Sequence, residues 1–141
     1  NKKIAKKVKS PVFFTSISYV DIIKSNSNYT VATDDLHLNK VLLITGIGNP
    51  TPLLKFLEDK NCEYRHLKFP DHHVFTKKDL QKIHHKFASI HADEKIILTT
   101  EKDFVRLSDN IDRLYYIGIE TSFVTGQNNF NSLVKKYVKS Y

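Results

Sequence analysis

From residue 41 onward, apolar runs of strand length alternate with segments whose apolar residues recur at helical spacing. The runs predict strands at 41–45, 64–69, 95–100 and 113–119, with helices after the first three and an amphipathic helix near the end, from Phe130 to Tyr141. Strands that alternate with helices form parallel sheets with right-handed crossovers. The sequence therefore predicts an α/β fold: a mostly parallel sheet of about four strands with helices on both faces.

The residues before this alternating region predict a different organisation. Residues 1–10 form a basic segment that contains Lys2, Lys3, Lys6, Lys7 and Lys9. Residues 11–33 combine a strand-like run, 11–20, with a polar turn at 24–30, and are predicted to be an extra strand or a linker hairpin. Residues 34–141 form the α/β region.

Composition excludes several classes of protein. The chain has 141 residues, enough for one domain with a real core, and no apolar run long enough to span a bilayer. Its only cysteine, Cys62, excludes an internal disulfide and fits a reducing compartment. The net charge is +7, and the lysine run in the first nine residues fits a solvated tail or helix face first, an anionic membrane or acidic substrate second and nucleic acid third. No nucleic-acid-binding motif is present, so no nucleic-acid partner is expected.

Three polar motifs directly follow the first three strands. Ligands of parallel α/β sheets bind outside the carboxyl ends of the strands, so all three motifs are expected at one edge of the sheet. The motifs "TGIGNP", "PDHH" and "TTEKD" supply the candidate residues Thr45, Gly46, Ile47, Gly48, Asn49, Pro50, Asp71, His72, His73, Thr100, Glu101, Lys102 and Asp103.

Each flanking motif also has a purely structural interpretation. "TGIGNP" lacks the lysine and Ser/Thr of a phosphate-binding P-loop, and Asn49 with Pro50 predicts an N-cap and a first helical residue. Thr100 with Asp103 three residues later also predicts a helix cap, as does Thr76 with Asp79.

The "PDHH" motif has three interpretations. Metal binding needs at least three converging ligands, and the other histidines supply no recognisable spacing, so no metal site is predicted. Proton transfer is reasonable because histidine titrates near neutrality and an adjacent carboxylate can orient it. In the third interpretation, Asp71 only shapes the turn before the helix. "DHH" also resembles a motif of metal-dependent phosphoesterases, whose additional aspartate motifs are not evident.

Taken in order and spacing, "TGIGNP", "FPDHHVFT" and "LTTEKDFVRL" resemble the successive motifs of the tetraacyldisaccharide 4'-kinase family, the lipid A 4'-kinases, across roughly residues 10–120. The resemblance implies transfer of the ATP γ-phosphate, with Mg²⁺, to the 4'-hydroxyl of a tetraacyldisaccharide 1-phosphate, a lipid A precursor, at the cytoplasmic face of the bacterial inner membrane. It also implies two α/β lobes, of which the N-terminal lobe carries the P-loop.

This sequence departs from that family pattern because it contains no G-x-x-x-x-G-K-[ST] motif. It also begins with Asn1 and has no methionine, so we expect a C-terminal lobe without its P-loop lobe, inactive as a kinase and binding neither ATP nor Mg²⁺ alone.

Within the resemblance, His72 or His73 would work with a carboxylate of the P-loop lobe, and Asp71 would orient the histidine or shape the loop. Lys102 would help to neutralise phosphate, and Glu101 or Asp103 would cap the helix or contact substrate or nucleotide. The motif 45–50 would form part of the cleft wall. The competing functions are a nonenzymatic α/β domain that binds a phosphorylated ligand and a metal-dependent phosphoesterase.

Overall fold

The computed structural model describes residues 10–140. The chain divides into two compact units. One spans Tyr19–Gly118 and is called the sheet unit. The other combines the chain on either side, Asn1–Ser18 with Ile119–Tyr141, and is called the ribbon unit; the predicted basic segment lies almost wholly outside its described residues.

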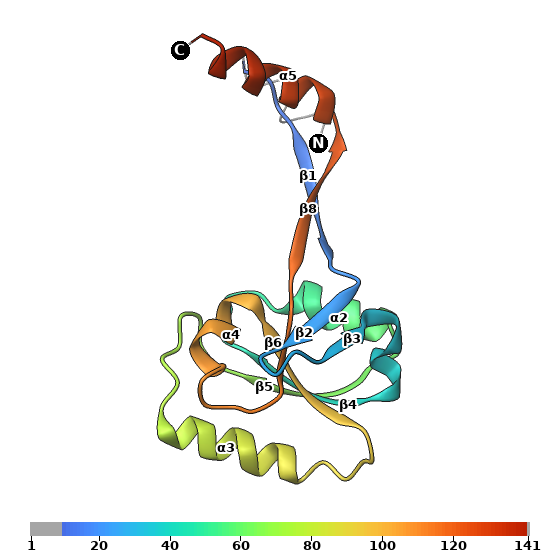
Figure 1. Ribbon diagram of the computed structural model, residues 1–141, viewed down its shortest axis with the longest axis vertical. Helices are drawn as coiled ribbons and strands as arrows, with labels where there is room; N and C mark the ends of the chain where they lie inside the picture. Colours follow the sequence, from blue (N-terminus) through green and yellow to red (C-terminus); the bar gives the residue numbers. More distant parts are fainter. Residues whose placement is uncertain (1–9, 141) are drawn as a thin grey trace. The chain divides into compact units, whose positions relative to one another are not determined.

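The sheet unit contains a sheet in the order β3-β2-β7-β6-β4-β5 (Figure 1). Four strands of this sheet pair with one another in parallel: β4 (Lys40–Thr45), β5 (Glu63–Lys68), β6 (Lys95–Thr100) and β7 (Leu114–Ile117). This arrangement confirms the predicted mostly parallel sheet. Two further strands, β2 (Ile22–Ser25) and β3 (Thr30–Ala32), extend it antiparallel. The sheet therefore has six strands rather than about four, because part of the segment predicted as an extra strand or a linker hairpin joins it.

Helices cover both faces of this sheet, as predicted. The helix α2 (Thr51–Asp59) buries Leu53 and Leu57 on the face that also buries Val41 and Leu43 of β4. On the opposite face, α3 (Lys77–Ala88) and α4 (Glu101–Leu107) bury Ile83 and Leu107 with Leu42 and Ile44. Successive residues of β4 thus point to opposite cores, which explains why its sequence is apolar throughout. A short 3₁₀ helix, η1 (Thr33–Leu38), precedes β4.

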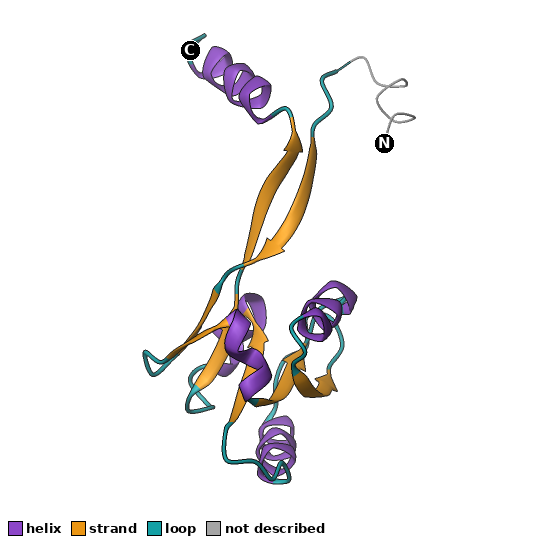
Figure 2. Ribbon diagram, turned by 90° about the vertical axis from the view of Figure 1, so that its right-hand side faces the viewer, coloured by secondary structure: helices purple, strands orange, loops and turns teal. Residues whose placement is uncertain are grey.

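The ribbon unit is built from β1 (Phe14–Tyr19), whose last residue belongs to the sheet unit, β8 (Ile119–Thr125) and α5 (Gln127–Val138). The two strands pair with each other and run in opposite directions (Figure 2). The rings of Phe13, Phe123 and Phe130 contact one another with centroids 5.0–6.4 Å apart. No described residue of β8 or α5 is buried, so this aromatic trio is the main apolar contact of the unit.

Two boundaries differ from the prediction. The run 113–119 is not one strand, because the chain passes from β7 to β8 at Gly118. Helix α2 begins at Thr51 with Pro50 as its N-cap, one residue later than predicted, and the Asn49 side-chain oxygen accepts a hydrogen bond from the Thr51 amide at 3.1 Å. Within residues 10–140, no helix is both long and apolar enough to cross a membrane.

Candidate functional site

Direct contacts join the three polar motifs at the carboxyl edge of the parallel strands. The Gly46 amide, after β4, donates a 2.7 Å hydrogen bond to Oδ2 of Asp103 in α4. Lys102 Nζ, also in α4, lies 2.8 Å from Oδ1 of Asp71, in the loop after β5. Asp71 also approaches Gly48, where an added Cβ would lie 3.3 Å from Asp71 Oδ2. The expectation that the motifs share one sheet edge is therefore confirmed.

Asp103 is a fully buried carboxylate that holds two of these segments together. Its Oδ2 accepts hydrogen bonds from the Gly46 amide and from Thr100 Oγ1, at 2.7 and 2.9 Å. Its own amide donates to Thr100 Oγ1, which confirms Thr100 as the N-cap of α4. Complete burial favours this capping role for Asp103 over contact with a ligand.

Gly46 lies close to this carboxylate. A Cβ at residue 46 would lie 3.1 Å from Asp103 Oδ1 and 3.4 Å from the Pro70 carbonyl oxygen. Asp103 Oδ1 is buried and has no hydrogen-bond partner among the described residues. The backbone of the loop after β4 therefore lies directly against α4, and a side chain at residue 46 would require Asp103 to shift by a few tenths of an ångström.

Asp71 has a carboxylate that already accepts hydrogen bonds from neighbouring groups, so it is not a free base. Its Oδ1 accepts hydrogen bonds from Lys102 Nζ at 2.8 Å and from the His72 amide at 3.0 Å. The hydrogen bond from Lys102 lowers the pKa of Asp71 below its ordinary value, with smaller contributions from the charges of His72 and Lys102 and from the His72 amide. Asp71 is thus held ionised at neutral pH and fixes the backbone at the start of His72.

The two adjacent histidines have different environments, which the sequence could not distinguish. The His73 ring stacks on Phe69, with centroids 4.9 Å apart, and its Nε2 lies 3.0 Å from Asp79 Oδ2. The His72 side chain is 73% exposed, with its Nε2 3.7 Å from Asp71 Oδ2, on a backbone with φ of 58°. His73 is therefore part of the packing before α3, whereas His72 is accessible to a ligand.

The N-terminus of α3 confirms the predicted capping box. Thr76 Oγ1 accepts from the Asp79 amide, and the Asp79 carboxylate accepts from the Thr76 amide at 2.9 Å. The side-chain hydrogen bond from Thr76 is the first cause that lowers the pKa of Asp79 to about 2, followed by the Thr76 amide and by His73. The same carboxylate therefore caps the helix and anchors His73.

Two site neighbours were not identified from the sequence. His66 Nε2 lies 2.8 Å from Oγ1 of the buried Thr45, and burial, followed by the charge of Lys68, lowers the pKa of His66. Arg106 donates a hydrogen bond from its NH1 group to the His73 carbonyl at 3.3 Å. The parallel register that aligns Leu43 with His66 would have placed this histidine beside Thr45, had the pairing been known.

The remaining predicted residues line the same edge. Gly48, Asn49 and Glu101 are exposed, Ile47 is half-buried and Pro50 is buried. Within residues 10–140, no group of three or more His, Cys, Asp or Glu side chains could hold a metal ion.

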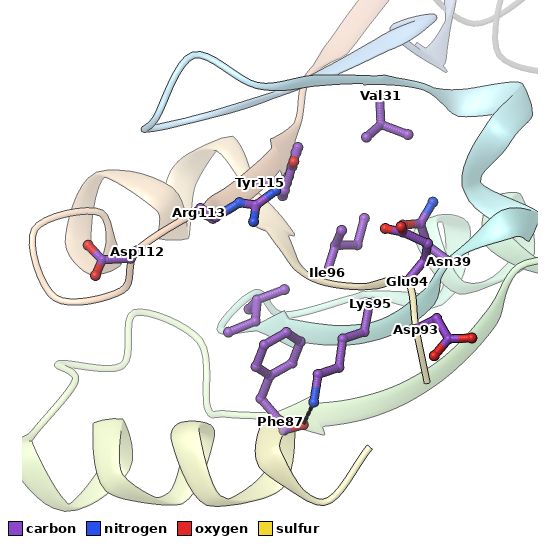
Figure 3. A pocket seen from close by; sticks show the side chains of 11 residues that line it. Val31, Asn39, Phe87, Asp93, Glu94, Lys95, Ile96, Asp112, Arg113 and Tyr115 are labelled. Carbon is purple, nitrogen blue, oxygen red and sulfur yellow. Dashed lines mark hydrogen bonds between the residues drawn. The ribbon is translucent and has the colours of Figure 1, made fainter. Parts of the chain in front are cut away.

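A separate cavity of about 370 Å³ lies at the opposite, amino ends of β6 and β7 (Figure 3). Lys95, Arg113 and Tyr115 are among its lining residues. The Lys95 ammonium donates to the carbonyls of Phe87 and Ile90, at 3.2 and 2.9 Å. None of the three motifs contributes a residue to this cavity, so it is distinct from the candidate site.

Comparison with known proteins identifies relatives of this chain. Residues 2–139 match the model of the tetraacyldisaccharide-1-P 4'-kinase family, LpxK. The tetraacyldisaccharide 4'-kinase of Flavobacterium psychrophilum is 40% identical over 134 residues, which cover 94% of this chain and 37% of that protein. The protein of the same description from Flavobacterium johnsoniae is 36% identical over 130 residues, covering 91% of this chain and 36% of that protein.

A solved structure has the same fold. The crystal structure of LpxK from Aquifex aeolicus in complex with ATP superposes with a TM-score of 0.61 at 17% sequence identity, over 92% of this chain and 37% of that one. At this identity the likeness concerns the fold alone.

The fold and the three joined motifs define an α/β domain with a polar site at the carboxyl edge of a parallel sheet. The chain belongs to the tetraacyldisaccharide-1-P 4'-kinase family. It spans little more than one third of the length of the curated relatives that it matches.

Proposed function

We propose that this chain is the C-terminal lobe of a kinase that transfers the ATP γ-phosphate to the 4'-hydroxyl of a tetraacyldisaccharide 1-phosphate, in the biosynthesis of lipid A and lipopolysaccharide. The observation that carries the proposal is that the three family motifs contact one another at one edge of the sheet, through Gly46–Asp103 and Asp71–Lys102.

The reaction defines what the lobe has to supply. The 4'-hydroxyl oxygen bonds to the γ-phosphorus, the bond from that phosphorus to its bridging oxygen breaks, and ADP leaves with the electron pair. The hydroxyl proton passes to a base. Phosphoryl transfer depends mainly on positioning and electrostatics, so groups that orient the hydroxyl and attract phosphate are the expected contributions of this chain.

His72 is the residue that we assign to the proton. Its imidazole is exposed, whereas His73 is stacked on Phe69 and bonded to Asp79. In the proposed mechanism His72 works with a carboxylate of the P-loop lobe. Asp71 fixes the His72 backbone, and Lys102 holds Asp71 while adding positive charge where phosphate would bind.

The described residues do not fit a Mg²⁺ site. Asp71 is paired with Lys102, Asp103 is buried beneath Gly46, and no third carboxylate joins them within residues 10–140. We therefore place ATP and Mg²⁺ on the P-loop lobe of the longer kinase and derive no step through them here. In this proposal the chain alone binds neither and has no kinase activity.

The acceptor is an acylated lipid, so the enzyme would act as a peripheral protein at the cytoplasmic face of the bacterial inner membrane. The net charge of +7 fits attraction to an anionic surface. Lys135 and Lys136 of α5, and Lys139 directly after it, are exposed.

The two histidines provide the test, in a two-lobe kinase that contains this chain. We expect His72→Ala to lower kcat about 10²- to 10⁴-fold, the range of general acid–base contributions, without lowering the urea midpoint. His73→Ala serves as the matched variant, and we expect it to lower the urea midpoint because it removes the Phe69 and Asp79 contacts.

Three results would contradict the proposal. These are full activity of His72→Ala, kinase activity of the 141-residue chain alone, and a gene that encodes no P-loop upstream of Asn1. A domain that binds a phosphorylated ligand without enzymatic activity would have no P-loop encoded upstream, and the isolated chain would still bind that ligand. A phosphoesterase would hydrolyse a phosphodiester to a phosphomonoester and an alcohol in the presence of added divalent metal.

A further inference from the structure

One flank of α3 carries a row of lysines. Lys78, Lys82 and Lys86 are spaced four residues apart, so they lie on one side of the helix along about 12 Å of its axis. All three are exposed. The sequence-based interpretation did not identify this row, because the lysines of the N-terminal segment are closer together in the chain.

The row runs beside the edge strand of the sheet. Lys82 Nζ lies 5.8 Å from the centroid of the Phe69 ring, directly after β5. At the other end of α3, Arg65 of β5 donates from its NH1 group to the Ser89 side chain at 3.2 Å. Since β5 is the last strand of the sheet, Arg65 extends the row at an open border of the unit. We call Arg65, Lys78, Lys82 and Lys86 the α3 basic row.

Neighbouring carboxylates are engaged elsewhere. Asp79 is the only acidic residue of α3, and it accepts hydrogen bonds from Thr76 and contacts His73. Glu63 of β5 forms an ion pair with Lys40. The α3 basic row therefore presents an excess of positive charge to solvent.

An exposed apolar residue lies, in the sequence, between the histidines of the candidate site and α3. Val74 is 80% exposed, two residues after His72 and two before the N-cap Thr76. Such exposure of a β-branched apolar side chain leaves its transfer from water to hydrocarbon available as a driving force.

We propose that the α3 basic row, together with Val74, is the surface through which the sheet unit meets an anionic lipid bilayer. The lysines would attract the headgroup phosphates, and Val74 would enter the acyl boundary. A polyphosphate such as nucleic acid would satisfy the lysines but would offer little to an exposed valine, so the bilayer is the partner that fits both features.

The inference rests on the proposed function, which requires the site to reach a lipid headgroup. The α3 basic row belongs to the same compact unit as His72 and Asp71, whereas α5 belongs to the ribbon unit. Contact through α3 therefore places the membrane contact and the candidate site in one compact unit.

The test is co-sedimentation of the 141-residue chain with vesicles of phosphatidylethanolamine and phosphatidylglycerol. One variant carries Lys78→Gln, Lys82→Gln and Lys86→Gln. Its matched control carries Lys135→Gln and Lys136→Gln in α5 and Lys139→Gln directly after that helix. Each removes three positive charges, so their net charges are equal. Circular dichroism and urea unfolding verify that both are folded.

Each basic residue near an anionic surface contributes about 1 kcal/mol, so we expect the α3 variant to lower the partition coefficient about 100-fold. We expect the α5 variant to lower the partition coefficient by less than about 10-fold. Val74→Ser should lower it several-fold without changing the charge. Equal losses in both triple variants would show a net-charge effect and overturn the inference, as would a larger loss in the α5 variant.

Two further measurements separate the alternatives. If the α3 variant loses binding to duplex DNA but keeps vesicle binding, a nucleic-acid surface replaces the proposed one. In a two-lobe kinase with detergent-dispersed acceptor, the α3 variant should retain its kcat. If the two-lobe protein binds vesicles through α3 but has no kinase activity, the proposed function alone is contradicted. If it is an active kinase but does not bind vesicles through α3, this inference alone is contradicted.

Discussion

Asp103 shows how one buried side chain can determine the geometry of a loop that contains no catalytic group. It accepts the Gly46 amide and the Thr100 hydroxyl through one oxygen, while its second oxygen faces the space that a side chain at residue 46 would occupy. A buried carboxylate needs such donors because desolvation without them is costly. The conformation of the loop after β4 therefore depends on residue 103.

We expect Asp103→Ala to lower the free energy of unfolding by about 1–3 kcal/mol, because it leaves the Gly46 amide buried without an acceptor. Asp103→Asn is the matched variant: its amide oxygen can still accept from Gly46, and its NH₂ group takes the place of Oδ1. The free energy of unfolding, measured with urea, should therefore be higher for Asp103→Asn than for Asp103→Ala. Equal losses in the two variants would contradict this role.

Some of the individual roles could be predicted from sequence, and others could not. The caps at Thr76 and Thr100 were predictable because a cap depends on residues three apart in the chain. The different environments of His72 and His73 were not, because they arise from contacts with Phe69 and Asp79 after folding. The burial of Asp103 likewise depends on Gly46, which is 57 residues away.

At the scale of elements, α3 depends on a single carboxylate at its N-terminus. Asp79 caps the helix and contacts His73, and these hydrogen bonds lower its pKa from 3.8 to about 2. Because the pKa is lower in the folded state, the unfolded state binds the proton first as the pH falls. The stabilisation from ionised Asp79 is therefore complete above about pH 4 and is lost as the pH falls toward 2.

The corresponding experiment compares the unfolding free energy of the wild-type chain with that of Asp79→Asn at several pH values. The difference between them should shrink as the pH falls from 4 to 2, since the variant has no carboxylate to protonate at this position. Asp93→Asn, which removes an exposed carboxylate from the loop before β6, controls for the loss of one charge. A difference that stays constant across this range would exclude the assigned pKa.

The sequence identified the elements with a continuous apolar run or a strong helical period, and missed those with neither. Strands β4 and β6 were evident because both faces are buried. Strands β2 and β3 have four and three residues, too few to show an alternation, and β8 has no buried residue. Strands β2 and β8 pair with strands far away in the chain, β7 and β1, and β3 pairs with β2.

For the whole molecule, the two units are expected to differ in stability because they differ in burial. Strand β4 is almost entirely buried, whereas β8 has no buried residue and the ribbon unit relies on the contacts of Phe13, Phe123 and Phe130. Local opening requires less free energy where few apolar contacts are broken. The amides of β8 should therefore exchange with solvent faster than those of β4.

Hydrogen exchange followed by mass spectrometry of the full chain tests this expectation. Phe130→Ala should accelerate exchange in β1 and β8 and leave β4 and β6 unchanged, because Phe130 contacts only rings of the ribbon unit among the described aromatic residues. Equal protection of β8 and β4, or acceleration in all four strands, would show that the two units unfold as one.

The pairing of β1 with β8 also has a consequence for the order of folding. Ser16 and Ser122 are hydrogen-bonded across the ribbon although 106 positions separate them in the chain. Closing so long a loop in an unfolded chain is entropically unfavourable. Once the sheet unit has folded, the Val20 amide is bonded to the Gly118 carbonyl, and the two strand ends are already neighbours. During synthesis, β1 therefore remains unpaired until β8 has been synthesised. We expect the pairing of β1 with β8 to begin next to Gly118, proceed away from the sheet unit and form after that unit has folded.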